Sequence, residues 1–196
     1  MKTSVRRLTA IALSALALVS CGTESPTAAL PQLQQSPPQN ASRDLLGLNA
    51  LLGMDGLQRT RPLAEPITVS KVIGPDGGTL AIPEAGVTVT VPRGALAATT
   101  NIVMTARAGT LVAYDFAPHG ITFAKPLVFS QKLSGTNATL LSAPLLQLGY
   151  YEDASLLTKT GGLVSQLLGG TVNTLTWTFT SSIPHFSGYM VSCGRR

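Results

Sequence analysis

Apolar and polar residues alternate with a period of two through the middle of the chain, from Val69 to Ser130. The clearest run is 87–91, Val-Thr-Val-Thr-Val, in which the valines fall on one face of an extended strand and the threonines on the other. Turn sequences such as Gly-Pro-Asp-Gly-Gly at 74–78 separate these runs. Short strands with turns every 8 to 12 residues or so, roughly the spacing of sandwich folds, predict an all-β domain, an antiparallel β-sandwich.

Further alternating sets place apolar residues on the inner face of the predicted sandwich. These sets are Ile102, Met104 and Ala106; Tyr114 and Phe116; and Leu175, Trp177 and Phe179. The last set contains the only tryptophan of the chain, which we therefore expect in the core. Two Leu-rich segments, 140–148 and 156–168, flank a predicted strand at 148–151, and the second favours either a short helix or an elaborated hairpin connection.

The first 21 residues have the three parts of an export signal. A basic start with Lys2, Arg6 and Arg7 precedes an apolar stretch at 8–19, which is too short to span a bilayer, where about 20 residues are needed. The segment ends in Leu-Val-Ser-Cys at 18–21, which resembles a bacterial lipobox. This resemblance implies a signal peptide at 1–20 and a lipidated N-terminus at Cys21, whose acyl chains (palmitate among them) insert in the membrane. The alternative is an ordinary cleaved signal with an incidental cysteine.

Between Cys21 and the predicted domain the composition changes twice. Residues 22–40 are rich in Ser, Thr, Pro and Gln, and we expect a disordered stalk there. Residues 42–57 carry leucines at near-helical spacing and predict a short helix, although three glycines weaken it. It would pack on the domain or contact the membrane or a partner, and 59–66 returns to linker. The predicted parts are therefore a signal at 1–20, a lipidated N-terminus, stalk and helix at 21–66, and a domain at 67–196.

Composition narrows the classes of function. Charged residues make up only 12% of the chain, and removal of the signal lowers the formal net charge from +5 to about +2. The sequence has no run or patch of basic residues, so we expect no nucleic-acid partner. With two histidines and no paired-cysteine motif, we expect neither a metal site nor a cofactor. In bacteria with two membranes, an aspartate directly after the lipidated cysteine resembles an inner-membrane retention signal. This chain has Gly22 at that position, so the predicted location is the outer membrane, facing the periplasm or the cell surface.

Three motifs within the alternating region resemble the ZU-five domain, which is shared by zonula occludens proteins, netrin receptors of the Unc-five type and ankyrins. The motifs are Gly-Gly-Thr-Leu at 77–80, the segment 86–96 with Val-Pro-Arg-Gly-Ala-Leu at its end, and Pro-His-Gly-x-x-Phe-x-Lys-Pro-Leu at 118–127. They cover roughly a third of the chain and occur in the family's order. The resemblance implies a β-sandwich and a scaffolding or interaction role, without naming a partner.

Near the end of the chain, His185-Phe186-Ser187 resembles the self-cleavage site of some signalling proteins that contain ZU-five domains. In such a reaction His185 takes the proton of the Ser187 hydroxyl, whose oxygen attacks the Phe186 carbonyl to form an ester that water hydrolyses. The structural alternative is a strand with Phe186 buried, His185 and Ser187 outward, and Gly188 at a bulge.

Three hypotheses of function follow. The first is a non-enzymatic, lipid-anchored module for binding or envelope structure, and the second is a self-cleaving lipoprotein that uses His185 and Ser187. The third is a carbohydrate-binding, adhesin-like surface protein, which would need exposed aromatics; the candidates are Tyr150, Tyr151 and Tyr189. Outside these, His119 is expected to be structural, in a Pro-His-Gly turn. Cys193 is expected to be a free thiol once Cys21 carries lipid.

Overall fold

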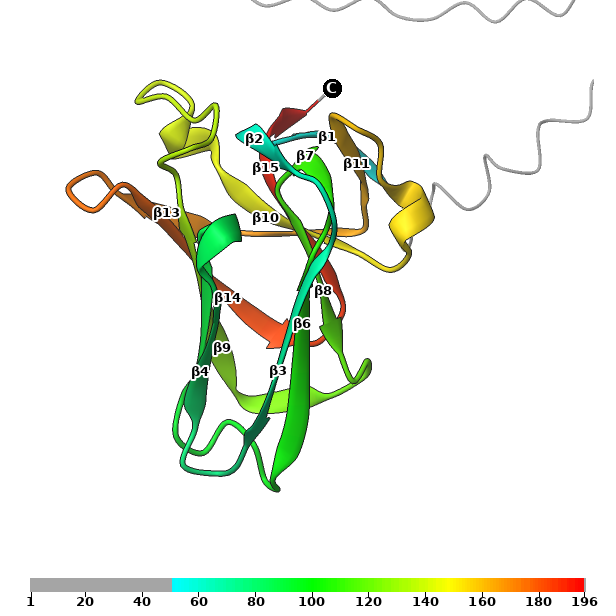
Figure 1. Ribbon diagram of the computed structural model, residues 1–196, viewed down its shortest axis with the longest axis vertical. Helices are drawn as coiled ribbons and strands as arrows, with labels where there is room; N and C mark the ends of the chain where they lie inside the picture. The colour runs from blue at the N-terminus through cyan, green and yellow to red at the C-terminus, as the bar shows by residue number, and fades with distance from the viewer. Residues whose placement is uncertain (1–50, 196) are drawn as a thin grey trace, which may run out of the picture. The chain divides into compact units, whose positions relative to one another are not determined.

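The computed structural model describes residues 51–195, which form two packed antiparallel sheets and a small third one (Figure 1). This confirms the all-β sandwich that the alternating pattern predicts. Cys21 and the predicted signal and stalk lie outside the described residues. Within 51–195, no helix has the length and hydropathy that crossing a bilayer requires.

Eight strands make up the first sheet. In spatial order its main path is β11 (Gly161–Val164), β1 (Leu52–Gly56), β15 (Gly188–Arg195), β8 (Ala113–Ala117), β6 (Thr100–Ala106) and β3 (Ile67–Ile73). Two further strands lie off this path, β10 (Gln147–Tyr151) beside β15 and β12 (Gln166–Leu168) beside β10. Within residues 51–195 the last strand, β15, thus pairs with β1, β8 and β10, which are far apart in the sequence.

Five strands make up the second sheet. Their order is β13 (Gly170–Asn173), β14 (Thr178–His185), β9 (Thr122–Lys132), β5 (Val87–Val91) and β4 (Gly78–Ile82). The turn before β4 needs glycine at residue 77, which has φ +81°, and a Cβ there would collide with the carbonyl of Val91. A 3₁₀ turn, η1 (Pro83–Ala85), connects β4 to β5.

The main core lies between the two sheets. Three of the inward sets predicted from alternation are buried there: Val87, Val89 and Val91 are exposed by at most 2%, and so are Ile102, Met104 and Ala106, and Tyr114 and Phe116. A second, smaller apolar cluster, which includes Met54, Tyr151 and Met190, lies on the other face of the first sheet. As a result β15 is covered on both faces.

Strands replace the short helix and the linker predicted before residue 67. Residues 52–56 form β1, which pairs with β11 and β15, while 42–50 lie outside the described residues. The expected linker contains β2 (Gln58–Leu63), which pairs with β7 (Gly109–Leu111). The leucine spacing was misleading because partners about 100 residues away in the sequence decide this conformation. The folded domain therefore begins before residue 67.

The sole tryptophan is not part of a strand. Trp177 ends the turn between β13 and β14 at φ 50°, and Leu175 at the same turn is 97% exposed. The side chain of Asn173 accepts hydrogen bonds from the backbone N–H groups of Leu175 and Thr176, at 2.9 and 3.1 Å, and so closes the turn. Of the predicted inward set, only Phe179 is fully buried.

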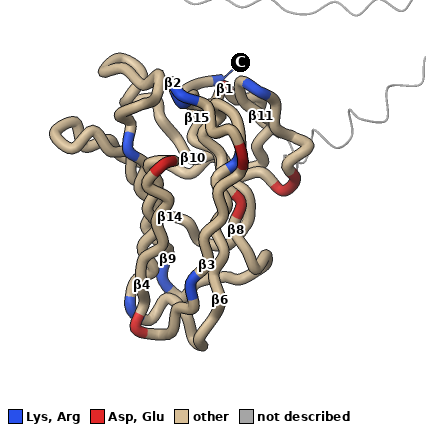
Figure 2. The backbone as a smooth tube through the Cα atoms, viewed as in Figure 1, with Lys and Arg blue, Asp and Glu red and all other residues tan. Residues whose placement is uncertain are grey.

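The two Leu-rich segments form turns and short strands. The first contains the 3₁₀ turn η2 (Ala143–Leu145). β10, which follows it, confirms the predicted strand at 148–151. The second begins where η3 (Ala154–Leu156) ends and contains β11 and β12, and so corresponds to the elaborated connection and not to a helix of its own. Figure 2 shows that few charged residues lie along the chain, in keeping with its composition.

Candidate functional site

The tripeptide His185-Phe186-Ser187 lies where the chain passes from one sheet to the other. His185 ends β14 in the second sheet, and β15 of the first sheet begins at Gly188. The backbone N–H of Phe186 donates to the carbonyl of Ile121 at 3.1 Å, and the Ser187 carbonyl accepts from the N–H of Phe116 at 3.0 Å. The crossing is therefore held by a backbone hydrogen bond on each side.

Phe186 is a core residue, as the structural alternative predicts. Its ring is 2% exposed, stacks on Phe116 with centroids 5.5 Å apart, and meets Phe123 edge-on at 4.7 Å. Because these partners come from different strands, Phe186 ties the crossing into the space between the sheets.

Ser187 does not face outward as that alternative expected. It is 6% exposed, and its Oγ donates to the carbonyl of Tyr151 at 3.3 Å. The bulge that this alternative placed at Gly188 lies earlier: the register of β14 with β9 shifts between Ile183 and His185. A buried hydroxyl needs an acceptor, and the end of β10 supplies one. The Ser187 proton is thus directed to a backbone carbonyl.

His185 is held by tyrosines. Its Nδ1 lies 3.3 Å from Tyr189 Oη, which also donates to the His185 carbonyl at 2.8 Å. Its ring meets Tyr150 edge-on at 4.9 Å. Among the hydrogen bonds of residues 51–195, none joins His185 to Ser187. The general-base contact that self-cleavage requires is not formed in this arrangement.

Burial keeps Tyr189 protonated, which suits it to donate. Desolvation raises its pKa well above the ordinary value, and the nearby Tyr150 acts in the same direction, while the hydrogen bond to the His185 backbone opposes the shift. Backbone strain of the left-handed kind is also missing from the tripeptide, since Trp177 is the only non-glycine residue at positive φ in the described part.

A cavity of about 500 Å³ opens beside the tripeptide and brings together residues that sequence reasoning kept apart. It is lined by both histidines of the chain, His119 and His185, and by Ser187 and Glu152. Glu152 follows β10 directly, a placement that no local motif indicates. Within 51–195, no three histidine, cysteine or acidic residues are grouped so that they could hold a metal ion.

Asp153, which follows Glu152, caps a 3₁₀ turn. Asp153 caps η3 by accepting the N–H of Ser155 at 2.7 Å, and this hydrogen bond lowers the pKa of the Asp153 carboxyl. The Asp153 carboxylate is therefore engaged at the start of η3.

Of the remaining sequence candidates, only Tyr150 lines this cavity. Tyr151 and Tyr189 are exposed by at most 1%, so the exposed aromatic platform considered for carbohydrate binding is not formed by them; only Tyr150 is partly exposed. The Cys193 thiol points to the carbonyl of Asp55 at 3.7 Å, and burial raises its pKa. Cys193 is thus a poor nucleophile at neutral pH.

A scan of the chain against protein-family models finds no match, and no curated protein matches it. The resemblance of the three motifs to the ZU-five domain stays a prediction.

Proposed function

We propose that the protein is an exported lipoprotein whose β-sandwich acts as a non-enzymatic binding or structural module of the cell envelope. The lipid on Cys21 anchors it, at the outer membrane, and the stalk holds the domain off the lipid surface.

The sequence around Cys21 carries the proposal. A basic start, a short apolar stretch and Leu-Val-Ser-Cys at 18–21 follow one another in the order that lipoprotein export requires. A single acyl chain gives only marginal membrane binding, whereas the several chains of a lipidated cysteine anchor firmly. The absence of an aspartate at residue 22 supports the outer membrane as the destination.

The geometry at the sheet crossing supports a role without chemistry. Ser187 Oγ donates to Tyr151, and His185 contacts Tyr150 and Tyr189. A buried Phe186 and a hydrogen-bonded Ser187 have a sufficient structural purpose in joining two sheets. Self-cleavage would need His185 to reorient toward Ser187.

Membrane fractionation in a bacterial host tests the anchor. The unaltered chain should be found in the membrane fraction, with a mass increased by lipid and reduced by loss of the signal peptide. Cys21→Ala should release the protein from that fraction. Cys193→Ala is the matched control, because it removes the other cysteine and should leave the protein membrane-bound. Retention of Cys21→Ala in the membrane at the level of the control would contradict the proposal.

A further inference from the structure

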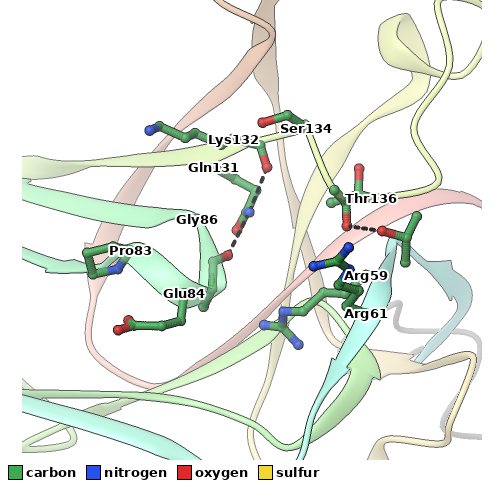
Figure 3. A pocket seen from close by; sticks show the side chains of 12 residues that line it. Arg59, Arg61, Pro83, Glu84, Gly86, Gln131, Lys132, Ser134 and Thr136 are labelled. Carbon is green, nitrogen blue, oxygen red and sulfur yellow. Dashed lines mark hydrogen bonds between the residues drawn. The ribbon is translucent and has the colours of Figure 1, made fainter.

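A second cavity, of about 470 Å³, lies far along the chain from the tripeptide, where β2 faces η1 and the end of β9 (Figure 3). Its walls carry Arg59, Arg61, Glu84, Gln131 and Lys132, together with hydroxyl-bearing residues of the loop after β9. The volume falls within the range of small-molecule sites, roughly 300–1,000 Å³. The polar walls disfavour an apolar ligand.

Positive charge predominates in this cavity. Arg59 and Arg61 alternate along β2 and so extend on the same side of the strand, and Lys132 ends β9 on the opposite wall. Glu84 is the one carboxylate among the lining residues, and Figure 3 shows its side chain pointing away from the two arginines. The ion pairs of residues 51–195 do not include Glu84. Among residues 51–195 no ion pair neutralises the two arginines, and Figure 3 shows that the Lys132 side chain also points away from them.

Arg59 makes this excess of charge costly. The residue is only 6% exposed, and its guanidinium donates to neutral oxygens: Nη1 to the Leu111 carbonyl at 2.5 Å and Nη2 to Tyr114 Oη at 3.4 Å. Its Nε–H is buried and has no acceptor. A buried charge is normally paired, because desolvation of an unpaired ion is strongly unfavourable. An anion in the cavity would supply the missing counter-charge.

The wall opposite the arginines is fixed in place. Tyr114 Oη donates to Gln131 Oε1 at 2.5 Å, and Gln131 Nε2 donates to the carbonyls of Ala85 and Lys132 at 3.0 and 2.8 Å. Because this network also contacts Arg59, the buried guanidinium cannot easily turn to solvent. The cavity is thus organised before any ligand arrives, which reduces the entropic cost of binding.

We propose that this cavity binds a small organic anion through a phosphate or carboxylate group held by Arg59 and Arg61, with Lys132 adding charge from the facing wall. The planar fork of a guanidinium matches both oxyanions. The proposal is independent of the lipid anchor, since every residue that carries it lies in the described domain.

Calorimetric titration of the purified full chain with inorganic phosphate and with citrate tests the proposal, with sodium chloride at matched ionic strength as the reference. At least one of the two probes should bind with a stoichiometry of one. Arg61→Gln should weaken that binding about tenfold or more, which corresponds to about 1.4 kcal/mol. Lys132→Gln should weaken it less, because the Lys132 side chain points away from the two arginines (Figure 3). Binding of phosphate alone would assign the site to phosphates, and binding of citrate alone to carboxylates.

Arg93→Gln is the matched control, since Arg93 is an exposed arginine that pairs with the exposed Asp76 outside the cavity. It should leave the affinity unchanged. Arg61 is itself exposed, so its replacement should not unfold the domain, and the circular dichroism spectrum checks this. If neither probe binds, or if Arg61→Gln and Arg93→Gln bind equally well, the proposal is wrong.

Discussion

Replacement of Phe186 measures how much the sheet crossing contributes to the stability of the domain. The ring is 2% exposed and has two aromatic partners, Phe116 and Phe123. Phe186→Ala should lower the free energy of unfolding by about 3–5 kcal/mol, from lost burial and the cavity left behind. Phe186→Leu keeps most of the volume but loses both ring pairs, at about 0.5–1.5 kcal/mol each, or about 1–3 kcal/mol in all.

Urea denaturation followed by circular dichroism provides the measurement, with the midpoint lowered and the slope unchanged. Leu175→Ala is the control, because this leucine is 97% exposed and its loss should change the free energy by no more than about 0.5 kcal/mol. If Phe186→Ala costs no more than Leu175→Ala, Phe186 does not hold the sheets together, and the structural explanation of the tripeptide fails.

Three further predictions concern single residues. Gly188→Ala should destabilise the domain by about 1–3 kcal/mol in the same urea assay, because the added Cβ would collide with the ring of Tyr151; an unchanged midpoint would contradict this packing. Burial raises the pKa of Tyr114 to about 12 from 10.0, so the unfolded state loses this proton first. Stability should therefore fall as the pH rises from 10.0 to about 12, and the melting temperature of Tyr114→Phe should fall less steeply over that window. Burial also raises the pKa of Cys193, so its reaction with a thiol reagent at neutral pH should be slower than that of the denatured chain, and equal rates would refute this.

Alternation along single strands predicted most of the fold because it records which face of a sheet is buried. It succeeded at 87–91 and at 102–106, where the inward residues line the main core. At Trp177, which packs partly buried against the core, it missed the turn, because alternation can continue through a turn. The turn is specified by the Asn173 side chain, and its two hydrogen bonds to backbone N–H groups interrupt a run that otherwise looks like one long strand.

Pairing between distant segments explains what the sequence pattern missed. β1 has no strong local signal, and its conformation depends on β11 and β15, both more than 100 residues later. The same holds for the candidate sites. Ser187 meets Tyr151, and Arg59 meets Leu111 and Tyr114, through contacts that no motif spacing encodes. Only the tripeptide itself could be identified beforehand, and its three residues carry no information about what each would contact.

Loss of β15 by cleavage at the tripeptide would affect the stability of the whole domain. Cleavage before Ser187 would separate a fragment that contains β15, whose edges pair with β1, β8 and β10. Tyr189, Met190 and Val191 on this strand are each 0% exposed, and their burial contributes about 1.5–3 kcal/mol apiece. That sum is comparable with the whole stability of a typical domain, about 5–15 kcal/mol.

A chain that ends at Phe186 should therefore show no cooperative urea transition. A chain that ends at Gly194 retains every buried residue of β15 and should unfold like the full chain. If the shorter chain keeps the midpoint of the longer one, β15 is dispensable to the fold. If it unfolds as expected, a cleaved protein could stay folded only while the fragment remains bound. Cleavage of the protein would then be detected when its mass is measured after denaturation, and missed when the mass is measured under native conditions.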